Sequence, residues 1–151
     1  MYKKILVPVD GSDTANAALQ EAIKLARSES TGLRIIHVAD SSAAIWDSEF
    51  TPIDLEQIRE SVRSFARGVL EQAQRTAREA GIEAETRLVE METPGQRVAK
   101  VIAEHAREWP ADLIVIGTHG RRGIDHFLLG SVAEGVMRLS PAPVLLVRGH
   151  R

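Results

Sequence analysis

The sequence predicts an α/β protein in which helices cover both faces of a parallel five-stranded sheet. Short runs rich in valine, isoleucine and leucine recur at residues 4–9, 33–39, 112–117 and 143–147. Most of these runs do not alternate with polar residues, which is typical of strands buried on both faces. Patterns with helical spacing lie between the runs, and this alternation of strands and helices favours a parallel sheet between two helical layers.

The first half of the chain predicts two strands and two helices. A helix over residues 13–29 follows the first strand, with Ser12 or Asp13 as its cap. After the strand at 33–39, a long helix is expected over residues 54–80, and Gly81 is its stop signal. Both helices carry an apolar face, consisting of Ala17, Ala18, Ile23, Leu25 and Ala26 in the first and Leu55, Ile58, Val62, Phe65, Val69 and Ala73 in the second.

The second half adds three strands and two helices. The run at 83–90 alternates more regularly, so we expect an edge strand with one face partly wet. Thr93 and Gln96 have capping-box spacing, and Pro94 takes the first position of the third helix. The fourth helix begins near Ser131 and ends at residues 140–143, which contain two prolines. In the third helix, one stripe along the helix surface is formed by Val98, Val101, Ile102 and His105.

Composition and charge narrow the class of protein. A chain of 151 residues suits a single domain, residues 1–151, and 44% apolar with 26% charged residues is ordinary for a soluble protein. A net charge of -2 gives no basic footprint for nucleic-acid binding. The absence of cysteine excludes disulfides and thiolate metal sites and fits a reducing compartment. No stretch approaches the roughly 20 apolar residues of a membrane span, so we expect a cytoplasmic protein without membrane insertion.

Asp10 is the first candidate for ligand binding, because it leaves the carboxyl end of the first strand. Ligands of open parallel sheets bind past the carboxyl ends of the strands, where the strand order reverses. A carboxylate there accepts hydrogen bonds from ribose hydroxyls, whereas the alternative is an aspartate that only caps a helix or turn. Its position favours the ligand role, although no G-x-G-x-x-G pattern follows the strand.

A glycine-rich stretch, residues 117–131, follows the fourth strand and is the second candidate. Gly117 and Gly120 allow the backbone to approach an anion closely. Gly130 and Ser131 open a helix, whose N–H groups and dipole favour phosphate. The Walker pattern is absent from the chain. Turn glycines before a capped helix would give a similar pattern, so the stretch by itself leaves both interpretations open.

These segments carry a family resemblance. The stretches MYKKILVPVDGSDTANAAL and ADLIVIGTHGRRGIDHFLLGSVAEGVMRLSPAPVLLV resemble the universal stress protein family. The spacing G-2x-G-9x-G-[ST], from Gly117 through Gly120 and Gly130 to Ser131, resembles its ATP-binding branch. The resemblance implies a Rossmann-like, adenine nucleotide alpha hydrolase-like fold with strand order 3-2-1-4-5. It also implies a nucleotide-dependent regulatory or stress-response module.

The resemblance further implies the roles of individual residues toward ATP. Asp10 would bind the ribose, and the Val38 backbone would meet the adenine edge. Independently of the resemblance, Mg²⁺ would arrive with the nucleotide and not at a dedicated site of the protein. Pro8 and Val9 would lie at the adenine and ribose, Ile116 and Gly117 would line the nucleoside pocket, and the phosphates would be held by His119, Gly120, Gly130, Ser131 and Val132. A homodimer, or a higher oligomer, would form through the last strand, residues 144–147. A regulatory protein partner is also expected, which the sequence does not identify.

Three functional hypotheses remain open from the sequence. The first is a non-catalytic nucleotide-binding module, because no nucleophile or acid–base pair accompanies the glycine-rich stretch. The second is a slow ATPase or nucleotidyl-transfer enzyme, for which His119 is the residue to test. The third is an interaction dimer whose glycines only form turns. We interpret His37, His105 and His126 as structural, and find no metal-ligand spacing.

The segment at residues 40–53 is the least informative part of the chain. It has no periodicity and carries Trp46 and Phe50. A long connection inside a compact domain is often functional, and a surface irregularity with an aromatic side chain packed on it is the equal alternative.

Overall fold

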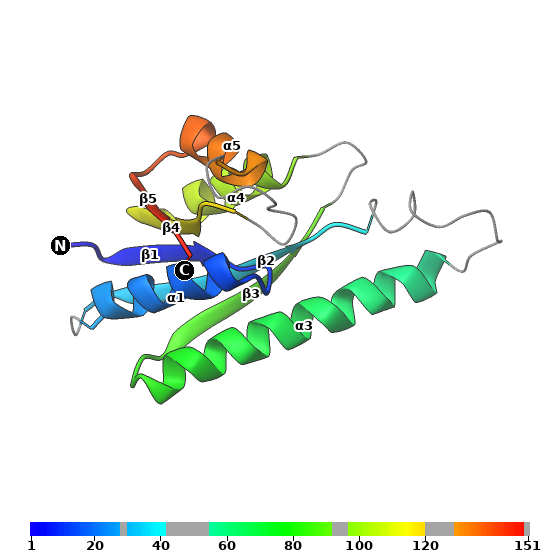
Figure 1. The fold of residues 1–151 in the computed structure, drawn as a ribbon, viewed down its shortest axis with the longest axis horizontal. Helices are drawn as coiled ribbons and strands as arrows, with labels where there is room; N and C mark the ends of the chain where they lie inside the picture. The colour runs from blue at the N-terminus through cyan, green and yellow to red at the C-terminus, as the bar shows by residue number, and fades with distance from the viewer. Residues whose placement is uncertain (28–29, 42–54, 92–96, 120–128, 150–151) are drawn as a thin grey trace.

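Five parallel strands form one sheet in the order β3-β2-β1-β4-β5 (Figure 1), which confirms the predicted fold class and strand order. The structure is a computed structural model that describes residues 1–27, 30–41, 55–91, 97–119 and 129–149. The order reverses at β1, because the chain moves from β1 to β2 and β3 on one side and then to β4 and β5 on the other. The strands are β1 Lys4–Pro8, β2 Gly32–Ala39, β3 Ala84–Glu90, β4 Leu113–Gly117 and β5 Val144–Val147.

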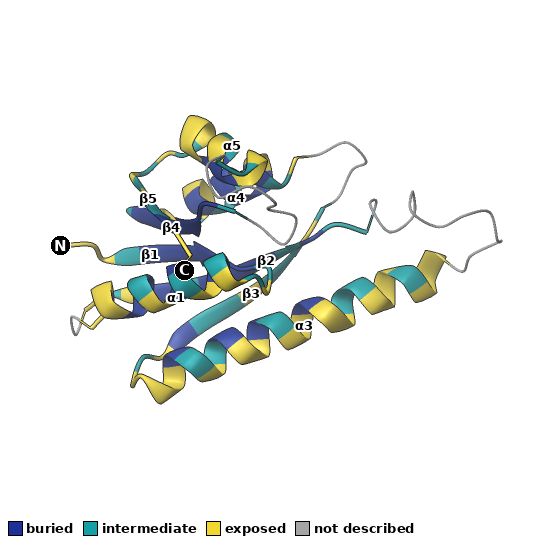
Figure 2. Cartoon of the chain, in the orientation of Figure 1, coloured by how far each residue is buried: buried dark blue, intermediate teal, exposed yellow. Residues whose placement is uncertain are grey.

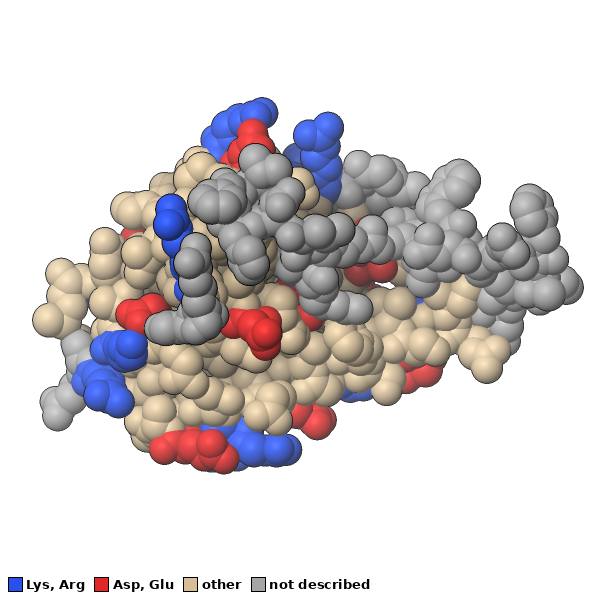
Figure 3. All heavy atoms as spheres, viewed as in Figure 1, with Lys and Arg blue, Asp and Glu red and all other residues tan. Residues whose placement is uncertain are grey.

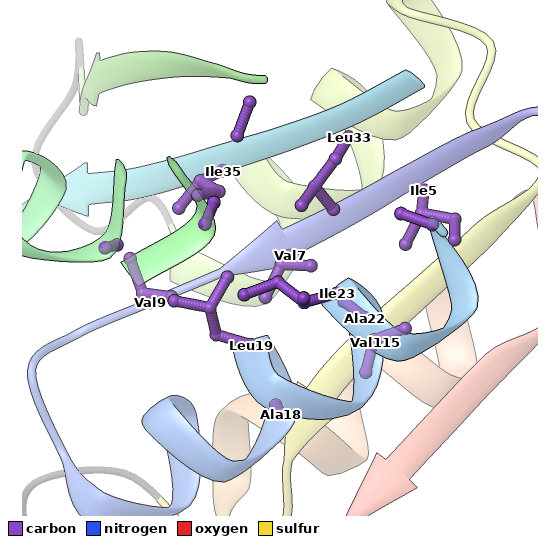
Figure 4. Packing of buried hydrophobic residues seen from close by; sticks show 14 of the residues in the cluster. Ile5, Val7, Val9, Ala18, Leu19, Ala22, Ile23, Leu33, Ile35 and Val115 are labelled. Carbon is purple, nitrogen blue, oxygen red and sulfur yellow. The ribbon is translucent and has the colours of Figure 1, made fainter. Parts of the chain in front are cut away.

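Helices cover both faces of the sheet in the described part of the chain (Figure 1). Helices α1 (Asp13–Leu25) and α3 (Leu55–Glu79) pack on one face, and α4 (Val98–Glu108) and α5 (Ser131–Leu139) pack on the other. Alternate residues of a strand point to opposite faces. The central strand β1 is therefore buried on both sides (Figure 2). Ile5 and Val7 lie in the core beneath α1 (Figure 4), and Leu6 lies in the core beneath α4.

Helix α1 begins as predicted and ends earlier than predicted. The Ser12 side chain caps it by accepting a hydrogen bond from the Ala15 N–H at 3.2 Å. The helix ends at Leu25, whereas the sequence predicted residue 29. Leu25, expected on the buried face, is 39% exposed. The face that packs on the sheet is instead formed by Ala15, Ala18, Leu19, Ala22 and Ile23, whose three- and four-residue spacing keeps them in one stripe.

The apolar stripe predicted for the long helix α3 is only partly its core face. Leu55 and Phe65 are 49% and 45% exposed, because the first turns of α3 project beyond the carboxyl ends of β2 and β3 (Figure 1). The helix stops before Gly81, whose φ of 82° is the left-handed conformation that a helix-terminating glycine adopts. The buried residues lie in the second half of the helix, at Ala66, Leu70, Ala73 and Ala77.

Helix α4 begins later than its capping-box pattern predicted. Arg97 is extended, with φ -92° and ψ 136°, so the helix starts at Val98 and does not run back through Arg97 to Pro94. Thr93, Pro94 and Gln96 lie outside the described residues. The fourth predicted helix, α5, ends at Leu139, and Ser140 is its C-cap, in agreement with the two prolines at residues 141 and 143. Strand β3 is the half-buried edge strand that its alternation predicted.

Helices α4 and α5 approach each other at a glycine. A Cβ placed on Gly135 would lie 2.5 Å from the Cβ of Ala99, so the two helices pack at a distance that only glycine permits. Gly68 on α3 is the opposite case, because a Cβ there would meet no atom within 4 Å.

We therefore expect opposite effects from the same substitution at these two glycines. Gly135→Ala should lower the free energy of unfolding by about 1–3 kcal/mol, because the helices must move apart. Gly68→Ala should raise it by about 0.5–1 kcal/mol, because alanine favours the helix and nothing obstructs it. Chemical denaturation of the two variants measures both values. Equal stability of Gly135→Ala and the wild type would contradict the close contact.

Candidate functional site

A cavity of about 1030 Å³ lies at the carboxyl ends of the central strands, where the strand order reverses. The loops after β1 and β4, the end of β2 and the first turn of α5 meet in it. Gly120 is a predicted site residue that lies outside the described residues. All the other predicted site residues line the cavity, namely Pro8, Val9, Asp10, Val38, Ile116, Gly117, His119, Gly130, Ser131 and Val132.

The loop after β1 is held in place by main-chain and side-chain hydrogen bonds. The Val9 N–H donates to the Ile36 carbonyl at 2.8 Å, which extends the pairing of β1 with β2 by one residue. One carboxylate oxygen of Asp10 accepts the Ser12 N–H at 2.9 Å. Gly11, between them, has a φ of 83° that favours glycine. Asp10 is thus a turn aspartate that also faces the cavity, so the two alternatives for this residue are not exclusive.

His37 is a cavity residue that the sequence interpretation treated as structural only. Its Nδ1–H donates to the Val9 carbonyl at 2.7 Å, and the side chain is buried. Its ring lies edge-on to Phe65 at a centroid distance of 6.0 Å. His37 therefore braces the β1 loop from the neighbouring strand while it lines the cavity. Its position near the carboxyl end of β2, the end at which ligands bind in parallel sheets, could have indicated this role from the sequence.

The apolar wall of the cavity was also missed from the sequence. Ile58, Val62 and Phe65 come from the half of α3 that projects past the sheet, and Val98 and Ile102 come from α4. The stripe along α3 was recognised as helical, but periodicity does not tell a core face from a cavity wall. These side chains give the cavity apolar surfaces of the kind that a flat aromatic base requires.

The first turn of α5 lines the cavity and has no side-chain cap among the described residues. Gly130 is the N-cap of the helix and provides no side-chain hydrogen bond to it. The N–H groups of a first helical turn have no acceptor within the helix, and Ser131, Val132 and Ala133 line the cavity at this point. Together with the helix dipole, these groups favour an anion.

His119 lies beside the α5 terminus, after β4. Its Nδ1 is 3.0 Å from the Thr118 hydroxyl. Its Nε2 is buried and has no hydrogen-bond partner among the described residues. A buried polar atom usually has a partner, so a ligand in the cavity would supply one. The described residues contain no group of three side chains able to hold a metal ion.

Fold and site together define a class of protein, the doubly wound α/β domain with a cavity at its switch point. Here a carboxylate lines one side of the cavity, and the start of a helix lines the other. Residues 1–148 match the Universal stress protein family. The chain belongs to this family. It is 37% identical over 154 residues to the universal stress protein YxiE of Bacillus subtilis, covering 98% of this chain and all of that protein.

Solved structures show the same fold. The chain resembles the universal stress protein UspA from Lactobacillus plantarum with a TM-score of 0.79 and 28% identity, over 97% of this chain and 98% of that one. A universal stress protein in complex with cAMP matches with a TM-score of 0.68 and 28% identity, over 99% and 98% of the chains. One from Archaeoglobus fulgidus in complex with dAMP matches with a TM-score of 0.67 and 27% identity, over 97% and 98%.

Charged residues of both signs are interspersed over the described surface that Figure 3 shows. No helix in the described ranges is long and apolar enough to cross a membrane.

At the amino end of the sheet, Arg34 lies over the Trp109 ring, with 4.4 Å between its guanidinium carbon and the ring centroid. Hydrogen bonds from Arg34, the shorter at 2.7 Å, hold the pKa of Glu85 below its usual range.

His105 completes this charged cluster. Its Nε2 is 3.3 Å from Nη1 of Arg34, so the neutral ring accepts a hydrogen bond from the guanidinium. Desolvation by burial lowers the pKa of His105, and the positive charge of Arg34 lowers it further. The charges around it come from three elements: Glu108 on α4, Glu85 and Arg87 on β3, and Arg34 on β2.

The lowered pKa predicts a loss of stability in acid. Above the unfolded-state pKa of about 6.5, His105 is neutral in both states and contributes no pH dependence. Below it, the unfolded state takes up a proton that the folded state resists, so the free energy of unfolding falls. His105→Gln keeps an acceptor for Arg34 and does not titrate. We expect its melting temperature to fall less than that of the wild type between pH 7.5 and pH 5, and equal losses would contradict this role.

Proposed function

We propose that the cavity binds an adenine nucleotide, with ATP as the ligand, and that the protein is a nucleotide-dependent regulatory module. The observation that carries the proposal is that Asp10 and the open first turn of α5 line the same cavity from opposite loops. The solved relatives in complex with cAMP and dAMP support an adenine nucleotide as the class of ligand.

The nucleotide would lie across the switch point. The adenine would pack between the apolar walls near Pro8, Val9 and Val38, and Asp10 would accept hydrogen bonds from the ribose. Ile116 and Gly117 would line the nucleoside pocket. The phosphates would lie at Gly120, Gly130, Ser131 and Val132, with His119 Nε2 as a further partner. Any Mg²⁺ would enter bound to the phosphates, as is usual for nucleotide sites.

Gly130→Asp tests the phosphate site without removing the cap of α5. Aspartate is a good N-cap, so the helix remains stable while the new carboxylate occupies its N–H groups and repels phosphate. We expect wild type to bind ATP with a submillimolar Kd and the variant to bind at least about 100-fold more weakly, close to 3 kcal/mol. Titration calorimetry with ATP and AMP measures this.

Gly68→Asp is the matched control, because it adds the same side chain to an open position that does not line the cavity. It should bind like the wild type. Equal affinities for Gly130→Asp and Gly68→Asp would contradict the phosphate site, and an absence of binding by the wild type would contradict the function.

We also propose that the module acts as a homodimer paired through β5. This strand is an edge of the sheet, and Leu145 in it is 39% exposed. An apolar edge strand in solution pairs readily with another chain. Met137 and Leu139, on the helix α5 that covers the other face of the sheet, are 46% and 44% exposed as well.

Leu145→Lys should therefore convert the dimer to a monomer, because a charge at the edge opposes strand pairing. Light scattering after gel filtration measures the mass. Leu25→Lys is the control, since Leu25 is also 39% exposed and lies in the last turn of α1, where a lysine favours the helix. A monomeric wild type, or a dimer that withstands Leu145→Lys, would argue against pairing through β5.

A further inference from the structure

Thr14 lies in the first turn of α1 and is half-buried, yet it does not line the cavity. Its hydroxyl donates a hydrogen bond to the carbonyl of His119, 105 residues further along the chain. The side chain thereby joins the helix after β1 to the loop after β4. Asp10, the proposed ribose contact, lies in the loop that leads into this helix, and His119, a proposed phosphate contact, lies in the loop after β4.

Counting protons fixes the direction of a short hydrogen-bond chain through Thr14. Its only hydroxyl proton goes to the His119 carbonyl. The Ser12 hydroxyl, 3.3 Å from the Thr14 oxygen, must then be the donor between the two. Ser12 in turn accepts the Ala15 N–H at 3.2 Å. The chain therefore runs from the α1 backbone through two hydroxyls to the backbone of the β4 loop, and successive hydrogen bonds of this kind strengthen one another.

Close packing around Thr14 is a second, independent observation that its position is fixed. A Cβ on Gly117 would lie 2.8 Å from the carbonyl carbon and oxygen of Thr14. A Cβ on Gly149, after β5, would lie 3.0 Å from the Thr14 methyl group. Both glycines leave room for this one residue, so its position is fixed by contacts on two sides.

The loop that Thr14 holds is also tied to α5. The Thr118 carbonyl accepts the Gly130 N–H at 2.7 Å, and the Thr118 N–H donates to the Val147 carbonyl at 2.9 Å. His119 is the next residue, and its main-chain carbonyl is bonded to Thr14. These contacts set the direction of the His119 ring, whose Nε2 is the buried atom without a described partner.

We propose that Thr14 is a positioning residue for the phosphate side of the site: its hydroxyl fixes the His119 backbone so that the imidazole and the start of the glycine-rich loop face the bound phosphate. The inference rests on the proposed nucleotide binding. It predicts that Thr14 acts on phosphate-bearing ligands and not on the nucleoside, because the Ser12–Asp10 hydrogen bond on the ribose side uses a main-chain donor and does not need Thr14.

Thr14→Val keeps the shape of the side chain and removes the hydroxyl, which leaves the His119 carbonyl without its donor. We expect AMP to bind about tenfold more weakly, a loss comparable to that of one partly buried hydrogen bond. Adenosine should bind as it does to the wild type. Thr14→Ser, which retains the hydroxyl, should restore AMP affinity. Titration calorimetry with AMP and adenosine gives both affinities, and Thr14→Ala is a second hydroxyl-free variant with less steric demand.

Thr76→Val is the matched control, because Thr76 on α3 also donates its hydroxyl to a carbonyl, that of Gln72 at 3.0 Å, away from the cavity. It should leave both affinities unchanged. Wild-type AMP affinity in Thr14→Val and Thr14→Ala, or equal losses for AMP and adenosine, would overturn the positioning role and leave the proposed function standing. Failure of the wild type to bind either AMP or ATP would overturn both.

Discussion

The close contact between the first turn of α1 and the end of β4 is the constraint on which the site depends. Gly117 has no room for a side chain, because the backbone of Thr14 occupies the space. The approach brings the loop that carries Asp10 to one side of the cavity and the start of α5 to the other. A side chain at Gly117 would separate these loops, so the glycine serves the packing of two segments at least as directly as any ligand.

The parallel sheet separates the two ends of the molecule by function. The central strands bury both faces, so polar groups gather only at their ends. At the carboxyl ends, the polar groups point into a cavity and one of them, His119 Nε2, lacks a described partner. At the amino ends, Arg34, Glu85 and His105 satisfy one another. A satisfied cluster is structural, whereas unsatisfied groups around a cavity are typical of a binding site.

Local sequence patterns predicted the elements of the fold, whereas the contacts between distant segments could not be predicted from them. The strands and the Ser12 cap were correct, because buried runs and capping residues are local signals. The strand order was also correct, but it was implied by the family resemblance and not by a local pattern. The stripe on α3 indicated a core face, since periodicity cannot show that the helix projects past the sheet. Helix α4 starts at Val98, although Thr93 and Gln96 have the spacing of a capping box. The packing role of Gly117 and the bracing by His37 needed contacts between segments far apart in sequence.

The two helices that begin at the switch point differ in a way that determines where an anion would bind. Helix α1 is closed by its own Ser12 cap, and the same loop carries the negative charge of Asp10. Helix α5 has Gly130 as its N-cap, and the φ of -62° there is open to any residue, so backbone strain does not require a glycine. Glycine in place of a capping side chain costs a helix only a few tenths of a kcal/mol. Since α5 has no side-chain cap among the described residues and its first turn lines the cavity, an anion is favoured at α5 and disfavoured at α1.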